Sequence, residues 1–320
     1  MTGAVTGSDG VDNRDGRAYA MTDELSLAVD VALATGRPLL LRGDPGSGKS
    51  SLAAYVARKR GWRYYEHVVT SRTEAHDLLW TFDAVRKLAD AQASRVLDEY
   101  AYVEPRALWW AFAPRSAARR GRPAGEPDGT PAVDPAHRIH DDDQAPSADH
   151  AVVLIDEIDK SEPDLPNNLL VPLGSQEFVV THTGTRVRRE PPERPDPTPL
   201  ARHLVVLTTN EERELPRAFL RRCVVAWLRR PDADRLVMIA RMHLDAYDGG
   251  HTVQDLQLAR AIADELMEVQ ADADRSALRA PSTAEFLDAL RACRGLGITV
   301  RSSAWPQLRK LLMVKPDHAE

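Results

Sequence analysis

The stretch "LLLRGDPGSGKSSLAAY" (39–55) constrains the fold more than any other part of the chain. Within it, "GDPGSGKS" (43–50) matches the pattern G-x-x-x-x-G-K-[ST], after a short apolar run and before an alanine-rich segment of helical composition. Glycines permit a tight turn that points successive backbone N–H groups at one anion. The pattern in this context therefore predicts a phosphate-binding loop between a buried strand and the N-terminus of a helix.

The residues of this loop have distinct expected tasks in binding a nucleotide. We expect the loop backbone to bind the β-phosphate, Lys49 to reach the β- and γ-phosphates, and Ser50 to be a ligand of Mg²⁺. The predicted nucleotide-binding residues are Gly43, Asp44, Pro45, Gly46, Ser47, Gly48, Lys49, Ser50 and Ser51. The alternative is a glycine-rich turn without a ligand, and the coincidence of motif, strand and helix disfavours it.

A second apolar run ends in two acids, in the segment "AVVLIDEIDKSE" (151–162). Downstream of a phosphate loop, we expect Asp156 to hold Mg²⁺ through its water shell and Glu157 to polarise the attacking water. The alternative is a pair of solvated acids at a strand end. We interpret Asp159 and Lys160 as a surface or subunit-contact pair and not as part of the chemistry.

The adjacent acids also separate the classes of phosphate-loop protein. A GTPase would carry an N-K-x-D motif that reads guanine, and the sequence contains none. A small-molecule kinase would carry a lid rich in catalytic arginines and rarely needs the second acid. Both classes are therefore disfavoured.

Strands and helices alternate in the first part of the chain, and helices alone follow. The apolar runs that predict buried strands are 38–42, 64–69, 151–155 and 203–209. Helix-like apolar spacing marks 76–92 and 104–112 in the first part, and later 231–246, 253–270, 282–294 and 303–314. The fold class is therefore α/β, with a parallel sheet flanked by helices and a C-terminal helical lid.

The same pass along the chain suggests its division into parts. Residues 1–16 are rich in Gly, Asp and Asn and predict a disordered tail. The nucleotide-binding α/β core covers 17–230, and the helical lid covers 231–320. Within the core, residues 114–149 lose periodicity and fill with Pro, Gly, Asp and Arg, which predicts a flexible, solvent-exposed insertion.

Composition limits the partners and the compartment. The net charge of -6 disfavours nucleic acid, and we interpret the basic clusters at 58–63 and 115–122 as solvated surface. No window holds 18 consecutive apolar residues, and the N-terminus has no signal-peptide pattern. Two cysteines give no disulfide framework. We therefore expect a cytoplasmic protein with no membrane span.

Taken together, "GDPGSGKS", "VVLIDEIDKS", "LTTNEERELPRAFLRRC" and the helical tail resemble an AAA+ ATPase of the MoxR type. The resemblance covers about residues 20 to 315, with 114–149 as an insertion. It implies a P-loop NTPase that binds ATP and Mg²⁺, hydrolyses ATP and forms a homo-oligomeric ring, a hexamer in this family. It further implies that hydrolysis remodels or activates a client protein, with a von Willebrand factor A domain protein as the candidate.

The resemblance also assigns residues outside the two motifs. Asn210, which closes "VVLTTN", takes the place of a polar sensor residue. An arginine that reaches the neighbouring subunit's γ-phosphate is Arg221 or Arg222, and the family position favours Arg222. A second sensor arginine is in doubt, because Ala284 occupies its place and Arg279 lies just upstream. The predicted catalytic residues are thus Lys49, Glu157, Asn210, Arg221 and Arg222.

Three points stay open at the level of sequence. A β-hairpin is predicted at 178–188, and it either faces the centre of the ring, as in the family, or is a plain surface hairpin. The chain is alternatively a nucleotide-dependent assembly switch with slow hydrolysis, which Glu157 argues against. A third possibility is a component of a nucleic-acid motor, which the acidic net charge argues against.

Overall fold

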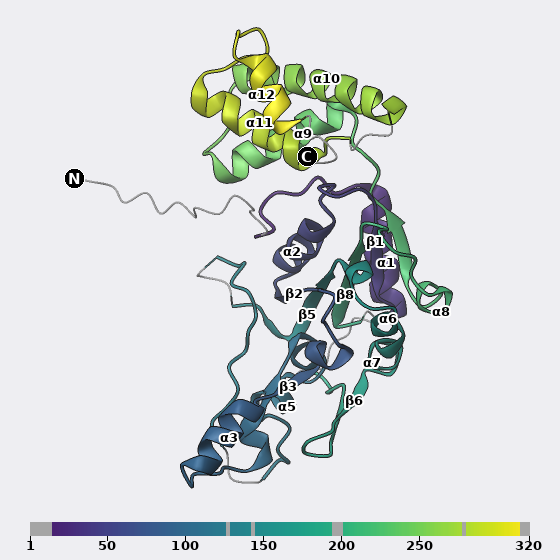
Figure 1. Cartoon of the computed structure of the whole chain (residues 1–320), viewed down its shortest axis with the longest axis vertical. Helices are drawn as coiled ribbons and strands as arrows, with labels where there is room; N and C mark the ends of the chain where they lie inside the picture. The colour runs from purple at the N-terminus through teal and green to yellow at the C-terminus, as the bar shows by residue number, and fades with distance from the viewer. Residues whose placement is uncertain (1–14, 126–128, 142–144, 194–200, 277–279, 314–320) are drawn as a thin grey trace, which may run out of the picture.

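The computed structural model of the chain describes residues 15–125, 129–141, 145–193, 201–276 and 280–313. An α/β body built around one sheet lies below a unit made only of helices (Figure 1). The predicted disordered tail falls outside the described residues up to residue 14. Asp15, at the end of that tail, accepts a 2.5 Å hydrogen bond from the hydroxyl of Tyr247 and is therefore tied to the helical unit.

The central sheet has five parallel strands in the order β2-β5-β8-β1-β9. The strands are β1 (Leu39–Arg42), β2 (Trp62–Val68), β5 (Ser147–Asp156), β8 (His203–Thr209) and β9 (Val224–Trp227). All four predicted strands are confirmed, because a parallel sheet covered on both faces needs continuous apolar runs. The edge strand β9 was not predicted.

Helices cover both faces of this sheet, and alternate residues of each strand point to opposite sides. Leu39 and Leu41 pack with α1 (Asp23–Thr35) and α2 (Lys49–Arg60) on one face. Leu40 points to the other face and joins a separate cluster. The predicted fold class, an α/β P-loop core with a helical unit after it, is confirmed.

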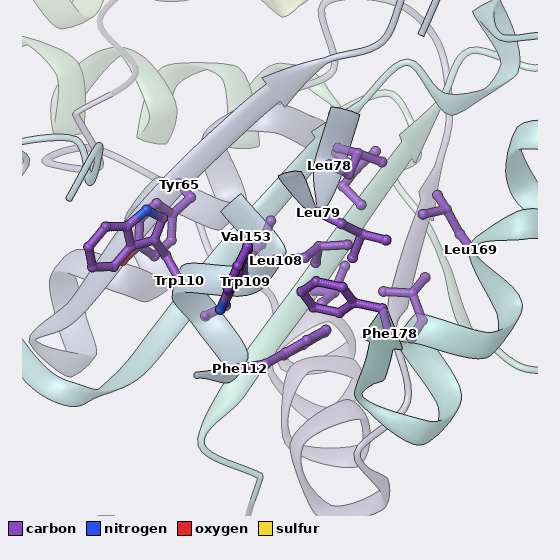
Figure 2. Packing of buried hydrophobic residues seen from close by; sticks show 14 of the residues in the cluster. Tyr65, Leu78, Leu79, Leu108, Trp109, Trp110, Phe112, Val153, Leu169 and Phe178 are labelled. Carbon is purple, nitrogen blue, oxygen red and sulfur yellow. The ribbon is translucent and has the colours of Figure 1, made fainter. Parts of the chain in front are cut away.

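The second face is covered by shorter helices. They are α4 (Ala107–Phe112), α5 (Pro114–Ala118), α6 (Asp164–Asn168) and α7 (Leu170–Ser175). Figure 2 shows the cluster on this face, where Val153 of the sheet lies among the side chains of Tyr65, Leu108, Trp109, Phe112, Leu169 and Phe178. Residues before and after the insertion therefore belong to the same hydrophobic core.

Two segments that we predicted as helices are each part strand and part helix. In 76–92, a turn of 3-10 helix is followed by β3 (Trp80–Phe82) and only then by α3 (Ala84–Gln92), whose N-cap is Asp83. In 104–112, β4 (Val103–Pro105) precedes α4 and pairs antiparallel with β3. Aromatic and β-branched residues in "WTF" favour the strand over the helical spacing.

The predicted β-hairpin is present. Its strands are β6 (Glu177–Val180) and β7 (Thr185–Arg188), which pair antiparallel. Gly184 in the turn has a φ of 69°, a conformation that glycine adopts without strain. His182 at the tip stacks on Phe82 with 3.9 Å between ring centroids, so the hairpin packs against the β3–β4 pair.

The insertion at 114–149 packs against the core at several of its described residues, and there the prediction of a flexible, solvent-exposed loop is corrected. Ile139 is only 5% exposed and its carbonyl accepts from the guanidinium of Arg58. The N–H of His137 donates to the carbonyl of Tyr64 at 2.8 Å, and Asp134 forms an ion pair with Arg63. Its apolar residues are spaced too far apart to give a periodic signal, so contacts with β2 decide its path. Residues 126–128 and 142–144 lie outside the described residues.

The C-terminal unit contains α9 (Ala233–Tyr247), α10 (Val253–Ser276), α11 (Thr283–Leu296) and α12 (Trp305–Leu312). Their buried side chains, among them Leu236, Ile262, Phe286 and Trp305, form a cluster of their own. This separate cluster supports our proposal of a core over 17–230 and a lid over 231–320. Within the described residues, no helix combines the length and the apolar character needed to span a bilayer.

Candidate functional site

The predicted phosphate loop connects the C-terminal end of β1 to the first residue of α2. Three of its glycines, Gly43, Gly46 and Gly48, have φ values of 145°, 73° and 88°. A Cβ atom at Gly43 would lie 2.5 Å from the carbonyl oxygen of Leu228, and one at Gly46 would lie 2.2 Å from Ser282 Oγ. Both the backbone conformation and the space therefore require glycine, and the loop is in close contact with the start of α11.

Lys49 is buried at the base of this loop, with 5% of its surface exposed. Its Nζ donates to the carbonyl oxygens of Gly43 and Asp44, at 2.8 Å each. Burial lowers the pKa of the Lys49 ammonium, and the nearby carboxylate of Asp156 opposes that change. Ser47 Oγ is buried without a hydrogen-bond partner among the described residues. A buried cation and an unsatisfied hydroxyl beside a helix N-terminus fit the phosphates of a nucleotide.

Asp156, the last residue of β5, is hydrogen-bonded to two hydroxyl groups. Ser50 Oγ donates to its carboxylate oxygens at 2.8 and 2.9 Å, and Thr208 Oγ1 of β8 donates at 2.5 Å. The loop helix, β5 and β8 thus bring their polar side chains to one point. Carboxylate and hydroxyl oxygens are the donors that Mg²⁺ prefers, so Ser50 and Asp156 fit this ion.

Glu157 follows Asp156 in the left-handed region, with a φ of 60°. Such a backbone is uncommon outside glycine and is held here by tertiary contacts. The Glu157 N–H donates to Thr208 Oγ1 at 2.9 Å. The carboxylate accepts from Asn210 Nδ2 at 3.3 Å and from Lys160 Nζ at 2.7 Å. The structure therefore places Asn210 against Glu157.

The interpretation of Asp159 and Lys160 as a surface pair is corrected. Asp159 is 2% exposed, and its Oδ2 accepts from the backbone N–H groups of Asn210 at 3.1 Å and Glu212 at 2.9 Å. Lys160 binds Glu157, and this hydrogen bond raises the pKa of the Lys160 ammonium. Asp159 therefore anchors the loop after β8 to the turn after β5. This anchoring depends on β5 and β8 lying side by side in the sheet, and the sequence pattern does not show which strands are neighbours.

A cavity of about 610 Å³ opens between the sheet and the helical unit. From the sheet side it is lined by residues 45–51 with Asp156, Glu157 and Asn210. From the lid side it is lined by Arg235 of α9 and by Ala284 and Arg291 of α11, among others. Ala284 thus reaches the cavity without an arginine's charge, whereas Arg279 lies outside the described residues. The lid arginines Arg235 and Arg291 were missed, although Arg291 follows Ala284 at a helical spacing of seven.

The fold and this cavity agree with the comparison to known families. Residues 38–223, more than half of the chain, match the profile of the AAA domain (dynein-related subfamily). The chain belongs to this family. The AAA+ part of the resemblance is thereby confirmed, and the match runs from the start of β1 to Cys223.

Solved structures similar to this AAA domain share little sequence with it. A putative ATPase from Cytophaga hutchinsonii is 12% identical; the match covers 95% of this chain and 84% of that one, with a TM-score of 0.44. The Thermotoga maritima RuvB Holliday junction branch migration motor is 14% identical over 85% and 66%, with a TM-score of 0.38. Domain III of the T. maritima replication initiation protein DnaA is 15% identical over 93% and 95%, with a TM-score of 0.40. No curated protein matches the chain.

Arg221 and Arg222 lie away from the 610 Å³ cavity beside the phosphate loop. They precede β9, whose first residue Val224 lies opposite Leu39 at the start of β1, and the two strands run parallel. The phosphate loop follows β1, so the paired strands separate it from the arginines by about 10 Å or more. A second cavity, of about 360 Å³, is lined by both arginines together with Arg37, Leu170, Leu173 and Cys223.

Proposed function

We propose that this AAA domain binds ATP with Mg²⁺ and hydrolyses it to ADP and phosphate. One observation supports it most strongly: Ser50, Asp156, Glu157 and Asn210 meet at the carboxyl ends of β5 and β8, beside the loop that ends in Lys49. Phosphoryl transfer depends on positioning and on electrostatic stabilisation, and this constellation supplies both.

Each side chain then has one task. The loop N–H groups and Lys49 bind the phosphates, and Ser50 and Asp156 hold Mg²⁺, which neutralises charge between the β- and γ-phosphates. Glu157 orients the attacking water and accepts its proton. Asn210 holds the Glu157 carboxylate through its amide, at the 3.3 Å contact described above. Arg235 and Arg291 add positive charge on the lid side of the cavity.

We further propose that the active species is a homo-oligomeric ring. Arg221 and Arg222 are both exposed and lie outside their own chain's nucleotide cavity, which supports a role at a neighbouring copy's site. The hexameric state, the MoxR type and a client with a von Willebrand factor A domain rest on the sequence resemblance. In this proposal, hydrolysis drives the remodelling or activation of that client protein.

The basic cluster at 115–122 supports a protein client over a nucleic acid. Three of its arginines are paired with acids of the same chain: Arg115 with Glu190, Arg120 with Glu104, and Arg122 with Asp98. Arginines that bind a phosphate backbone must be available to replace its counterions. We therefore do not assign this cluster to nucleic acid.

Replacing Glu157 by glutamine tests the proposal, because this change keeps the size of the side chain and removes the base. ATP binding, measured by titration calorimetry with Mg²⁺, should stay near wild type. Phosphate release should fall by about 10²- to 10⁴-fold, the usual contribution of a positioned general base. The control is Glu162→Gln, an exposed acid five residues further on.

Two outcomes would contradict this assignment. If Glu157→Gln turns over within about twofold of wild type, another group acts on the water. If the wild-type protein binds ATP and assembles but releases no phosphate, the assembly switch describes the protein better than the ATPase does.

A further inference from the structure

Arg37 connects the entry to β1 with the segment that carries Arg221 and Arg222. It follows Gly36, the left-handed residue that ends α1, and precedes β1 by one proline. Its Nε donates to the carbonyl oxygen of Arg222 at 3.1 Å, and its Nη2 donates to the carbonyl oxygen of Arg221. One guanidinium therefore binds two consecutive carbonyls that lie more than 180 positions away in the sequence.

These carbonyls lie at the end of a helix that is too short to be stable on its own. Helix α8 (Arg217–Leu220) has four residues, and an isolated single turn is unstable in water. The last carbonyls of any helix lack partners within the helix, and a cationic side chain can supply them. Arg37 does this for the two residues that follow α8.

The surroundings fix one side of this segment and leave the other side open. Phe219 and Cys223 are buried at 1% and 6% exposure and anchor the backbone to the core. Within the part of the chain that the structure describes, the Arg222 side chain hydrogen-bonds only inside its own segment, where Nη1 donates to the carbonyl of Ala218 at 3.3 Å. The side chains of Arg221 and Arg222 are exposed at the rim of the 360 Å³ cavity, which Arg37 also lines.

We propose that Arg37 is a positioning residue for the arginine that this chain supplies to a neighbouring copy. The inference rests on the proposed function. Arg37 precedes β1, whereas its own phosphate loop follows β1, so its loss should leave nucleotide binding in its own chain unchanged. A displacement of about 1 Å in a catalytic group costs on the order of 10²-fold. Arg37→Ala should therefore lower kcat by about 10- to 100-fold, less than the loss of the arginine itself.

The test is a complementation experiment with three variants that carry different defects. Lys49→Ala has a defective pocket and an intact supplied arginine. The double variant Arg221→Ala/Arg222→Ala has an intact pocket and no supplied arginine, whichever of the two acts. Arg37→Ala should behave like the double variant. It should bind ATP with wild-type affinity, regain activity when mixed with Lys49→Ala, and regain none when mixed with the double variant.

Two controls separate positioning from a structural effect. Arg37→Lys keeps a positive charge but cannot bind both carbonyls in one plane. Its activity should therefore lie between those of Arg37→Ala and wild type. Arg275→Ala removes an exposed arginine of the lid that pairs with Asp272 three positions before it, and this variant should match wild type in every mixture.

The possible failures are distinguishable. If the double variant regains activity with Lys49→Ala but Arg37→Ala does not, or if Arg37→Ala alone is fully active, the role of Arg37 is refuted and the proposed function stands. If Arg37→Ala loses ATP binding, Arg37 is a structural residue of the core. If the double variant regains no activity in mixed assemblies, the shared site itself is refuted, and the role of Arg37 with it.

Discussion

Replacing Asp159 by alanine should loosen the loop that carries Asn210. The Asp159 carboxylate is 2% exposed and accepts two backbone N–H groups, at 2.9 and 3.1 Å. A buried hydrogen bond to a charged group contributes about 1.5–3 kcal/mol, so two of them give an upper range of about 3–6 kcal/mol. Water can enter the space left by the side chain, so we expect the free energy of unfolding to fall by about 3 kcal/mol. For a domain of this size, that corresponds to a melting temperature lower by about 6–12 °C.

Thermal unfolding and ATP turnover of three variants would measure this effect. Asp159→Asn keeps one oxygen acceptor and should lose about half as much stability as Asp159→Ala. Glu162→Ala, at an exposed acid of the same segment, should stay within about 0.5 kcal/mol of wild type. Turnover should fall in Asp159→Ala because Asn210 no longer holds Glu157. A melting temperature within about 1 °C of wild type for Asp159→Ala would show that the loop is held by other contacts.

Three further predictions concern the loop, the insertion and the response to acid. Lys49→Ala should weaken ATP binding at least about tenfold in calorimetry, and unchanged affinity would contradict the role of its buried ammonium. Ile139→Ala should lower the free energy of unfolding, measured in urea, by about 2–4 kcal/mol. Val133→Ala, at a residue that is 87% exposed, should lower it by less than about 0.5 kcal/mol. Equal small losses would mean that the insertion is not packed. Burial lowers the pKa of His203 to about 3, so below its ordinary pKa of 6.5 the unfolded state binds the extra proton. Between pH 6.5 and 5.5 wild type should lose about 1 kcal/mol more than His203→Leu, and parallel pH profiles would refute this.

The parts of the fold that follow from short-range pattern were predictable. The four predicted strands, β1, β2, β5 and β8, lie in a sheet that is covered on both faces, so each shows as an apolar run, and the lid helices keep their spacing. Strand β9 has only four residues with alternating exposure, and it is a strand because β1 pairs with it. The pair β3–β4 was hidden because three-residue strands give no period. The insertion packs through contacts with β2, which no local pattern encodes.

The candidate site likewise contains some residues that the sequence reveals and others that it does not. The phosphate loop and the acids after β5 are contiguous motifs, so their residues could be identified from the sequence, although their roles stay predictions. Thr208 and Asp159 were not identified, because each acts across the border between β5 and β8, more than 50 positions away along the chain. Arg37 depends on the placement of α8 beside the start of β1, which the sequence does not reveal.

Phosphate release by the wild-type protein, measured at steady state over a wide range of protein concentration, tests the account most directly. A site that is completed by an arginine of a neighbouring copy is active only in the assembly. We predict that turnover per chain with ATP and Mg²⁺ rises steeply with protein concentration and then levels off as assembly is completed. Turnover that is constant per chain down to concentrations where only monomers exist, or no phosphate release at any concentration, would contradict the account.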